Sequence, residues 1–109
     1  MAKKNEFPAG ALVMLALRVL QGGSLHGYAI AQRIRIISSD VLRVEEGSLY
    51  PALQKMLLKG WVSSSWGESE TGRKVRFYKL TAAGKKQLQE ELKRHELVSK
   101  AIDSVLNTA

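Results

Sequence analysis

The last part of the chain constrains the fold most strongly, because from Thr81 onward it contains no proline and, after Gly84, no glycine. Thr81 is a good N-cap residue, so the sequence predicts one helix from there almost to the C-terminus. At 1.5 Å per residue that helix is about 40 Å long, more than the body of a small domain can cover. Its apolar stripe is therefore expected to pack on another chain and make a dimer. The stripe comprises Leu88, Leu92, Val98, Ala101, Ile102, Val105 and Leu106.

A first helix is predicted at residues 9–21, a strongly apolar stretch that ends at Gly22 and Gly23. The stretch has hardly any polar face, and a helix of that kind needs cover on several sides. We expect the core of its own chain to supply most of that cover, with a second subunit as a further source.

A second helix of about 11 residues is predicted from Ile30, Ile34 and Ile37, which recur at helical spacing after a turn region at Ser24–Gly27. The segment that follows is partly β-branched. It has room for a brief strand around Leu42–Val44.

A third helix is predicted from about Ser48 to Lys59, with Gly60 well placed just past its end. Pro51 is compatible with this helix, because backbone N–H groups in the first turn have no helical partner. One side carries apolar residues at helical spacing, namely Leu49, Leu53, Met56 and Leu57. The other side carries Tyr50, Pro51, Gln54 and Lys55, and also Leu58, which the pattern does not explain.

A β-hairpin is predicted next, with strands at residues 61–66 and 74–80 and a polar loop between them. Its tip and descending strand carry Arg73, Lys74 and Arg76, which are suited to phosphates or to the minor groove. Acidic residues at positions 68 and 70 oppose this charge. Trp61 and Trp66 are assigned to the core and the sheet surface rather than to a cofactor site.

The net charge of +7 is concentrated in the first part of the chain. Residues 1–80 carry 12 Lys and Arg against 6 Asp and Glu, whereas residues 81–109 carry 5 against 4. The sequence therefore predicts two parts, a polyanion-binding domain at residues 1–80 and an interaction helix at residues 81–109.

Several classes of protein are disfavoured by composition. The chain has no cysteine and only two histidines, so we expect no metal site and no cofactor. No motif joins an acid, a base and a nucleophile, so an enzyme is not expected. No apolar run reaches the length of a membrane span, and the start lacks the pattern of a secretory signal, which makes the cytoplasm the expected location.

Three helices followed by a basic two-stranded hairpin describe a winged helix-turn-helix, so the predicted fold class is mainly α with a small β-hairpin (α+β). In that fold the third helix enters the major groove of DNA. Gln54 can pair with adenine and Lys55 with phosphate or guanine, while Ser48 and Tyr50 can donate to phosphates. An ordinary solvated helix surface is the alternative for this face, and the basic hairpin favours DNA.

The stretches "LHGYAIAQRI", "EEGSLYPALQKMLLKGWV" and "ESETGRKVRFYKLTAAG" resemble successive signatures of the PadR family of bacterial transcriptional regulators. The resemblance extends over about residues 9–107 and fits the compact subclass with a single helix after the wing. It implies a homodimeric repressor that binds palindromic promoter DNA and releases it on binding a small effector. It also implies that the first and last helices build the dimer, with Leu12 joining the stripe residues in that contact.

Carried over by position, the resemblance implies DNA contacts in the helix-turn-helix and the wing: Tyr28, Ser48, Tyr50, Gln54, Lys55, Arg73 and Lys74. For Tyr28, packing against the helix pair is an equal alternative, and His26 is expected to be a turn or cap residue. Compact members of the family often carry an aromatic residue early in the last helix, where this chain has His95. The resemblance therefore gives no aromatic effector site here.

A winged-helix module that binds an acidic protein instead of DNA is the second hypothesis. The acidic residues of the hairpin, Glu68 and Glu70, leave room for this alternative.

Overall fold

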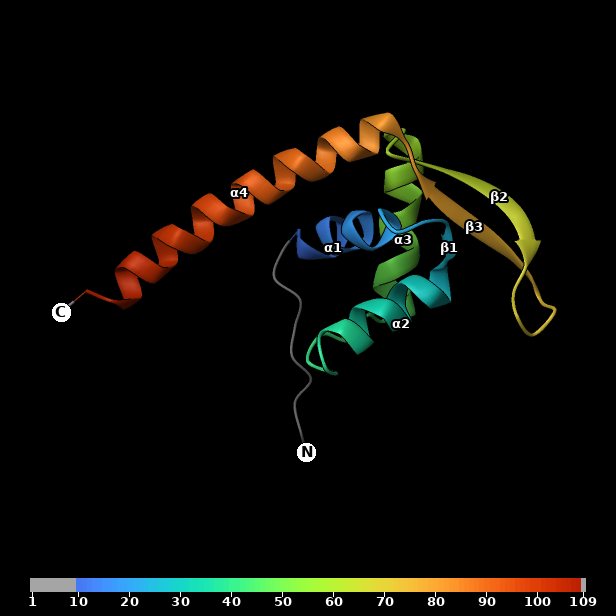
Figure 1. Ribbon diagram of the computed structural model, residues 1–109, viewed down its shortest axis with the longest axis horizontal. Helices are drawn as coiled ribbons and strands as arrows, with labels where there is room; N and C mark the ends of the chain where they lie inside the picture. The colour runs from blue at the N-terminus through green and yellow to red at the C-terminus, as the bar shows by residue number, and fades with distance from the viewer. Residues whose placement is uncertain (1–9, 109) are drawn as a thin grey trace.

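The computed structural model describes residues 10–108, and in this range three helices and a small sheet form one body from which a fourth helix extends (Figure 1). The elements follow in the order α1 (Ala11–Leu20), β1 (Leu25–His26), α2 (Gly27–Ile37), α3 (Glu46–Leu58), β2 (Val62–Glu68), β3 (Lys74–Leu80) and α4 (Ala82–Leu106). The α+β winged-helix class predicted from the sequence is confirmed. Residue 9 of the predicted first helix lies outside the described residues.

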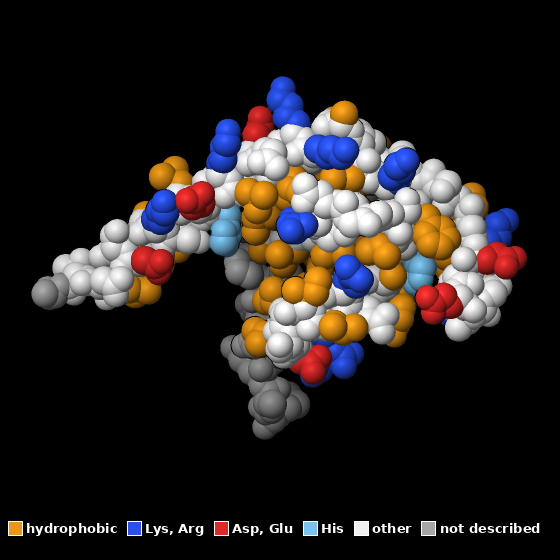
Figure 2. Space-filling model, viewed as in Figure 1, with side chains coloured by type: hydrophobic (Ala, Val, Ile, Leu, Met, Phe, Trp, Pro, Cys, Tyr) orange, Lys and Arg blue, Asp and Glu red, His pale blue; other side chains and the backbone are white. Residues whose placement is uncertain are grey.

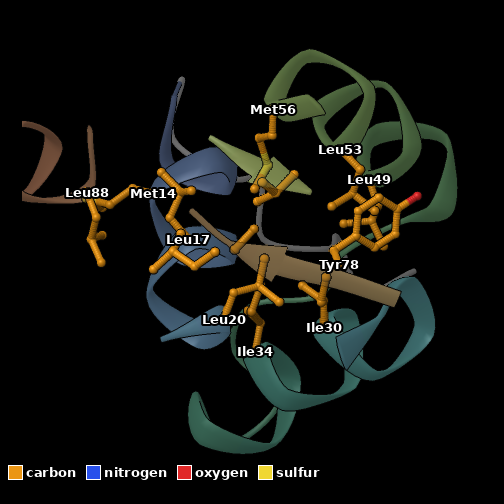
Figure 3. Packing of buried hydrophobic residues seen from close by; sticks show 13 residues of the cluster. Met14, Leu17, Leu20, Ile30, Ile34, Leu49, Leu53, Met56, Tyr78 and Leu88 are labelled. Atoms are coloured by element: carbon orange, nitrogen blue, oxygen red, sulfur yellow. The ribbon is translucent and has the colours of Figure 1, made fainter. Parts of the chain in front are cut away.

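The core lies where α1, α2 and α3 meet the inner ends of β2 and β3 (Figure 3). Leu17, Leu20, Ile30, Leu53 and Met56 are among its most completely buried side chains. Their burial explains why the first two helices form where the apolar spacing predicted them. α1 is covered by α2, α3, β3 and α4, in accord with its nearly all-round apolar surface.

The sheet is antiparallel and has the order β1–β3–β2. β2 and β3 form the predicted hairpin, and β2 continues to Glu68, past the expected end of the strand. β1 was not predicted; its two residues, Leu25 and His26, pair with Tyr78 and Phe77 of β3. The brief strand expected at Leu42–Val44 is wrong, because this segment is a bend and irregular chain.

α3 ends as its sequence predicts, at a glycine in the left-handed region. Gly60 has φ +76°, its N–H donates to the carbonyl of Leu57 at 3.0 Å, and the N–H of Trp61 donates to the carbonyl of Met56 at 2.9 Å. These two bonds make a Schellman motif. The helix begins at Glu46, two residues before the predicted start, and has no side-chain cap at that end.

α4 begins at a junction that also holds the end of α3 and the base of the hairpin. The Thr81 hydroxyl accepts from the N–H of Gly84 at 3.0 Å, which makes it the predicted N-cap. The same hydroxyl donates to the carbonyl of Gly60 at 2.7 Å, and the Thr81 N–H donates to the carbonyl of Trp61 at 3.1 Å. One residue therefore fixes where α4 leaves the body.

Replacing Thr81 by alanine should lower the free energy of unfolding by about 1–2 kcal/mol, since the helix loses its cap and the Gly60 carbonyl loses its donor. Urea denaturation followed by circular dichroism measures the effect. Thr81→Ser keeps the hydroxyl and should stay within about 0.5 kcal/mol of wild type. Equal losses in the two variants would contradict the role given to the hydroxyl.

The first turns of α4 pack on α1 and β3, and the rest of this 25-residue helix extends away from the body (Figure 1). Leu88 was assigned to the subunit contact, and that assignment is wrong. Its side chain is fully buried in the core of its own chain, so it is not available to a partner. The remaining stripe residues are exposed, namely Leu92, Val98, Ala101, Ile102, Val105 and Leu106. In the space-filling view, hydrophobic side chains are visible on α4 and on the adjoining body (Figure 2).

Candidate nucleic-acid interface

α3 presents the predicted contact residues on one exposed side and its apolar residues on the other. Leu49, Leu53 and Met56 are buried in the core, and Leu57 packs against it. Ser48, Tyr50, Pro51, Gln54 and Lys55 are all exposed. The burial of one side fixes the rotation of the helix about its axis, so the other side has a defined direction.

Tyr50 links α3 to the start of α2. Its side chain is 51% exposed, yet the ring lies against the backbone of Gly27. A Cβ added at Gly27 would be 3.3 Å from Cε1 of Tyr50 and 3.5 Å from its hydroxyl oxygen. The absence of a side chain at Gly27 therefore lets the Tyr50 ring lie across the two helices. The ring is held in place by this packing although half of its surface is exposed.

Tyr28 stands at the surface near the start of α2. Its side chain is 65% exposed and lines the surface between α2 and α3, so it is not buried between the two helices. Its ring is nearly parallel to that of His26, at 6.4 Å between centroids, and His26 in turn meets the edge of Phe77 at 5.6 Å. His26 is the N-cap of α2, as predicted, and its Nδ1 accepts from the N–H of Ala29 at 3.4 Å.

A shallow hollow of about 260 Å³ lies between α2 and the N-terminal half of α3. Tyr28 and Tyr50, which are far apart in sequence, both line it. Its other polar lining residues were not predicted as site residues, and they are Gln32, Arg35, Arg43, Glu45 and Glu46. Arg35 lies off the isoleucine stripe of α2, a signal that it faces outward. The hollow carries charges of both signs.

The connection between α2 and α3 is held by Arg35 and Asp40. The Nε of Arg35 donates to Oδ1 of Asp40 at 2.6 Å, and the N–H of Asp40 donates to the carbonyl of Arg35 at 2.9 Å. This hydrogen bond, reinforced by the opposite charge, lowers the pKa of the Asp40 carboxyl and raises that of the Arg35 guanidinium. Ser39 and Asp40 both have positive φ, so the chain reverses sharply here. The segment after this reversal pairs with no strand of the sheet.

The hairpin carries the predicted basic residues at and beside its tip. The N–H of Ser69 donates to the carbonyl of Arg73 at 2.8 Å, and Gly72 adopts φ +80° within the turn. Arg73, Lys74 and Arg76 are all exposed. The sequence analysis assigned Trp66 to the sheet surface, and the structure confirms this, with its side chain 63% exposed.

Leu58 is the remaining outward residue of α3, and its side chain is 79% exposed. Nothing in the structure explains it.

Within residues 10–108, no group of three His, Asp or Glu side chains is arranged to hold a metal ion. No helix in that range is both long and apolar enough to cross a membrane.

Comparison with known proteins agrees with this geometry. A family model described as "Transcriptional regulator PadR-like family" matches residues 16–90, more than half of the chain. An uncharacterised protein from Lysinibacillus sphaericus is 27% identical over 100 residues, which cover 92% of each chain.

Two solved structures are similar along most of their length. A transcriptional regulator from Clostridium thermocellum superposes with a TM-score of 0.80 at 27% identity, covering 87% of this chain and 92% of that one. A PadR family transcription regulator from Clostridium difficile gives 0.76 at 26% identity, covering 90% and 100%.

Proposed function

The chain belongs to the PadR-like family of transcriptional regulators, and we propose that it acts as a homodimeric repressor of palindromic promoter DNA. Family membership makes it a DNA-binding regulator of transcription and not an enzyme. The proposal includes the dimer, the repressor role, the division into two parts at residue 80 and a cytoplasmic location.

The exposed side of α3 is the observation that carries the proposal. Gln54 and Lys55 stand on that side, while Leu49 and Leu53 on the opposite side are buried in the core. A helix held in this way can be inserted into the major groove as a rigid unit, with Gln54 reading a base edge and Lys55 meeting phosphate or guanine. We assign Ser48, Tyr50 and Tyr28 to the phosphates that flank this helix.

The basic wing supports the same function. Arg73 and Lys74 lie at the tip of an ordered hairpin and remain exposed, so their charges are free to reach phosphates beside the groove. We propose that these two residues fix the orientation of the domain on the duplex.

The dimer in the proposal rests on the part of α4 beyond Leu88. Leu92, Val98, Ile102, Val105 and Leu106 recur at helical spacing and remain exposed in the single chain. A contiguous apolar stripe of this kind on a soluble protein marks an interaction surface. A second copy would bury the stripe, with Leu12 of α1 at its inner end, and would place two recognition helices for two half-sites.

The family resemblance also implies release of DNA by a small effector, and we include it in the proposal. A thermal-shift screen of small organic compounds tests it. An upward shift that is accompanied by loss of DNA binding would support the proposal, and the absence of any such compound would leave it unsupported.

Titration of the purified protein onto the promoter region of its own gene tests the regulatory proposal directly. Binding should be sensitive to salt and tighter than binding to a random duplex of equal length. Equal affinity for the two duplexes would contradict a specific operator. A pull-down with nuclease treatment addresses the second hypothesis, since protein partners that survive the nuclease would favour it.

Gln54→Ala should weaken specific binding by about 1–3 kcal/mol at a single base position of the operator, because one bidentate contact to a base edge is lost. Lys74→Ala is the matched comparison. It should weaken binding to all sequences alike and reduce the slope of log K against log salt by about 1. Anisotropy titrations over a set of single-base operator variants measure both effects. A uniform loss for Gln54→Ala would assign that residue to the backbone.

A further inference from the structure

An exposed tryptophan, Trp66, stands among the cations of the wing. Trp66 lies on β2 directly opposite Arg76 of β3, and two positions toward the tip Glu68 lies opposite Lys74. Paired residues of an antiparallel ladder share a face, and side chains two positions apart share it too. These four side chains therefore project from one face of the outer hairpin.

That face is the one by which the hairpin packs onto the helices. Going inward from Trp66, the same register gives the pairs Ser64 with Tyr78 and Val62 with Leu80. Tyr78, Val62 and Leu80 are buried in the core. The outer hairpin extends beyond the helices (Figure 1), so Trp66 occupies the continuation of the core-facing side where no helix covers it.

Two cations lie against the Trp66 ring. The Nζ of Lys74 and the Cζ of Arg76 are each 5.4 Å from the ring centroid, within cation–π range. Both come from β3, and the indole is still 63% exposed. A large flat apolar surface is therefore presented to solvent with two positive charges held beside it.

We propose that Trp66 is a direct DNA contact of the wing, with its ring packed against a deoxyribose of the duplex backbone while Lys74 and Arg76 meet the flanking phosphates. This inference rests on the proposed DNA-binding function. The ligand it requires is an apolar ring with anions next to it, and the sugar–phosphate backbone offers both. A free phosphate offers nothing to the indole, and an apolar peptide offers nothing to the two cations.

Intrinsic fluorescence of Trp61→Phe protein tests the contact without altering Trp66, which is then the single tryptophan in the chain. Titration with a mixed-sequence DNA duplex at low salt should quench and shift the emission. The change should saturate at the same duplex concentration as binding measured by anisotropy. Inorganic polyphosphate is the control, because it supplies the charges without a sugar. Binding of DNA with no change in emission, or an equal change with polyphosphate, would overturn the inference.

Substitution of Trp66 itself gives a second readout. Trp66→Ala should weaken binding of the same duplex about tenfold while leaving the salt slope as in wild type, because every cation is retained. Trp66→Phe keeps an aromatic ring and should recover most of the affinity. Thermal unfolding monitored by circular dichroism checks that each variant is folded.

The outcomes distinguish this inference from the function on which it rests. Wild-type protein that does not bind DNA at all would refute the proposed function. Wild-type binding that Trp66→Ala leaves within twofold would refute the tryptophan contact alone. A reduced salt slope in Trp66→Ala, like that expected for Lys74→Ala, would show that the ring only positions the cations and would also refute the contact.

Discussion

Replacing Gly84 by alanine is expected to lower the free energy of unfolding by about 3 kcal/mol. A Cβ at this position would overlap the carbonyl oxygen of Trp61 and lie 2.7 Å from Cδ1 of Leu80. The overlap is with backbone at the base of the hairpin, so a change of rotamer cannot relieve it. Helix propensity alone predicts the opposite sign, since alanine is favoured over glycine in a helix by about 1 kcal/mol.

Urea denaturation at fixed protein concentration measures this effect, and the concentration must be held constant because a dimer would be stabilised by mass action. Lys85→Ala is a suitable control, because it changes the next residue of the same helix at an exposed position. It should stay within about 0.5 kcal/mol of wild type. If Gly84→Ala were as stable as wild type, α4 would not approach the hairpin as closely as described.

Ile102→Asp should weaken the proposed dimer about 100-fold or more, since an unpaired carboxylate buried in an apolar interface costs about 3 kcal/mol or more. Ile102 is about half exposed in the single chain and lies on the part of α4 that leaves the body. The fold of the protomer should therefore survive, and sedimentation velocity should show a monomer at micromolar concentration. Affinity for a two-half-site operator should fall with it, because each monomer would then bind a single half-site.

Ser104→Asp provides the matched control, because it adds the same charge to the same helix at an exposed position off the apolar stripe. Two residues along an α-helix turn the side chain by about 200°, so residues 102 and 104 point to nearly opposite sides. This variant should remain dimeric. A monomeric wild-type protein, or a dimer that Ile102→Asp leaves unchanged, would remove α4 from the proposed interface.

The elements predicted well are those whose signals are local. Thr81 as a cap and Gly60 as a helix end were both predicted correctly, because each depends on hydrogen bonds within a few residues of the chain. The isoleucine and leucine spacings identified α2 and the buried side of α3 for the same reason. The start of α3 was predicted two residues late, since it has no side-chain cap to mark it.

The elements that were missed depend on distant parts of the chain. β1 has two residues and exists through its pairing with β3, more than 50 residues later, so no periodicity could predict it. The strand expected at Leu42–Val44 had suitable residues but follows the reversal at Ser39 and Asp40 and pairs with no strand. Leu88 fits the apolar stripe of α4 as well as its neighbours do. Its place in the core follows from the packing of α4 on α1 and β3, which the local sequence does not reveal.

The candidate interface divides in the same way. Exposure of Gln54, Lys55 and the wing cations could be predicted from the period of the helix and the position of the turn. The hollow between Tyr28 and Tyr50, and the cations held over Trp66, could not, because both require the relative placement of two elements.

Hydrogen bonds at Thr81 link the end of α3, the base of the wing and the start of α4, so they hold the direction of α4 relative to the other two. α4 is about 37 Å long, so a change of about 5° in its direction at that residue moves its far end by about 3 Å. In the proposed dimer, the separation of the two recognition helices would follow from this angle and not from the length of a flexible linker. The protein would then select operators by the distance between their half-sites. The stiffness of a few hydrogen bonds around Thr81 would set how far that distance can deviate before binding is lost.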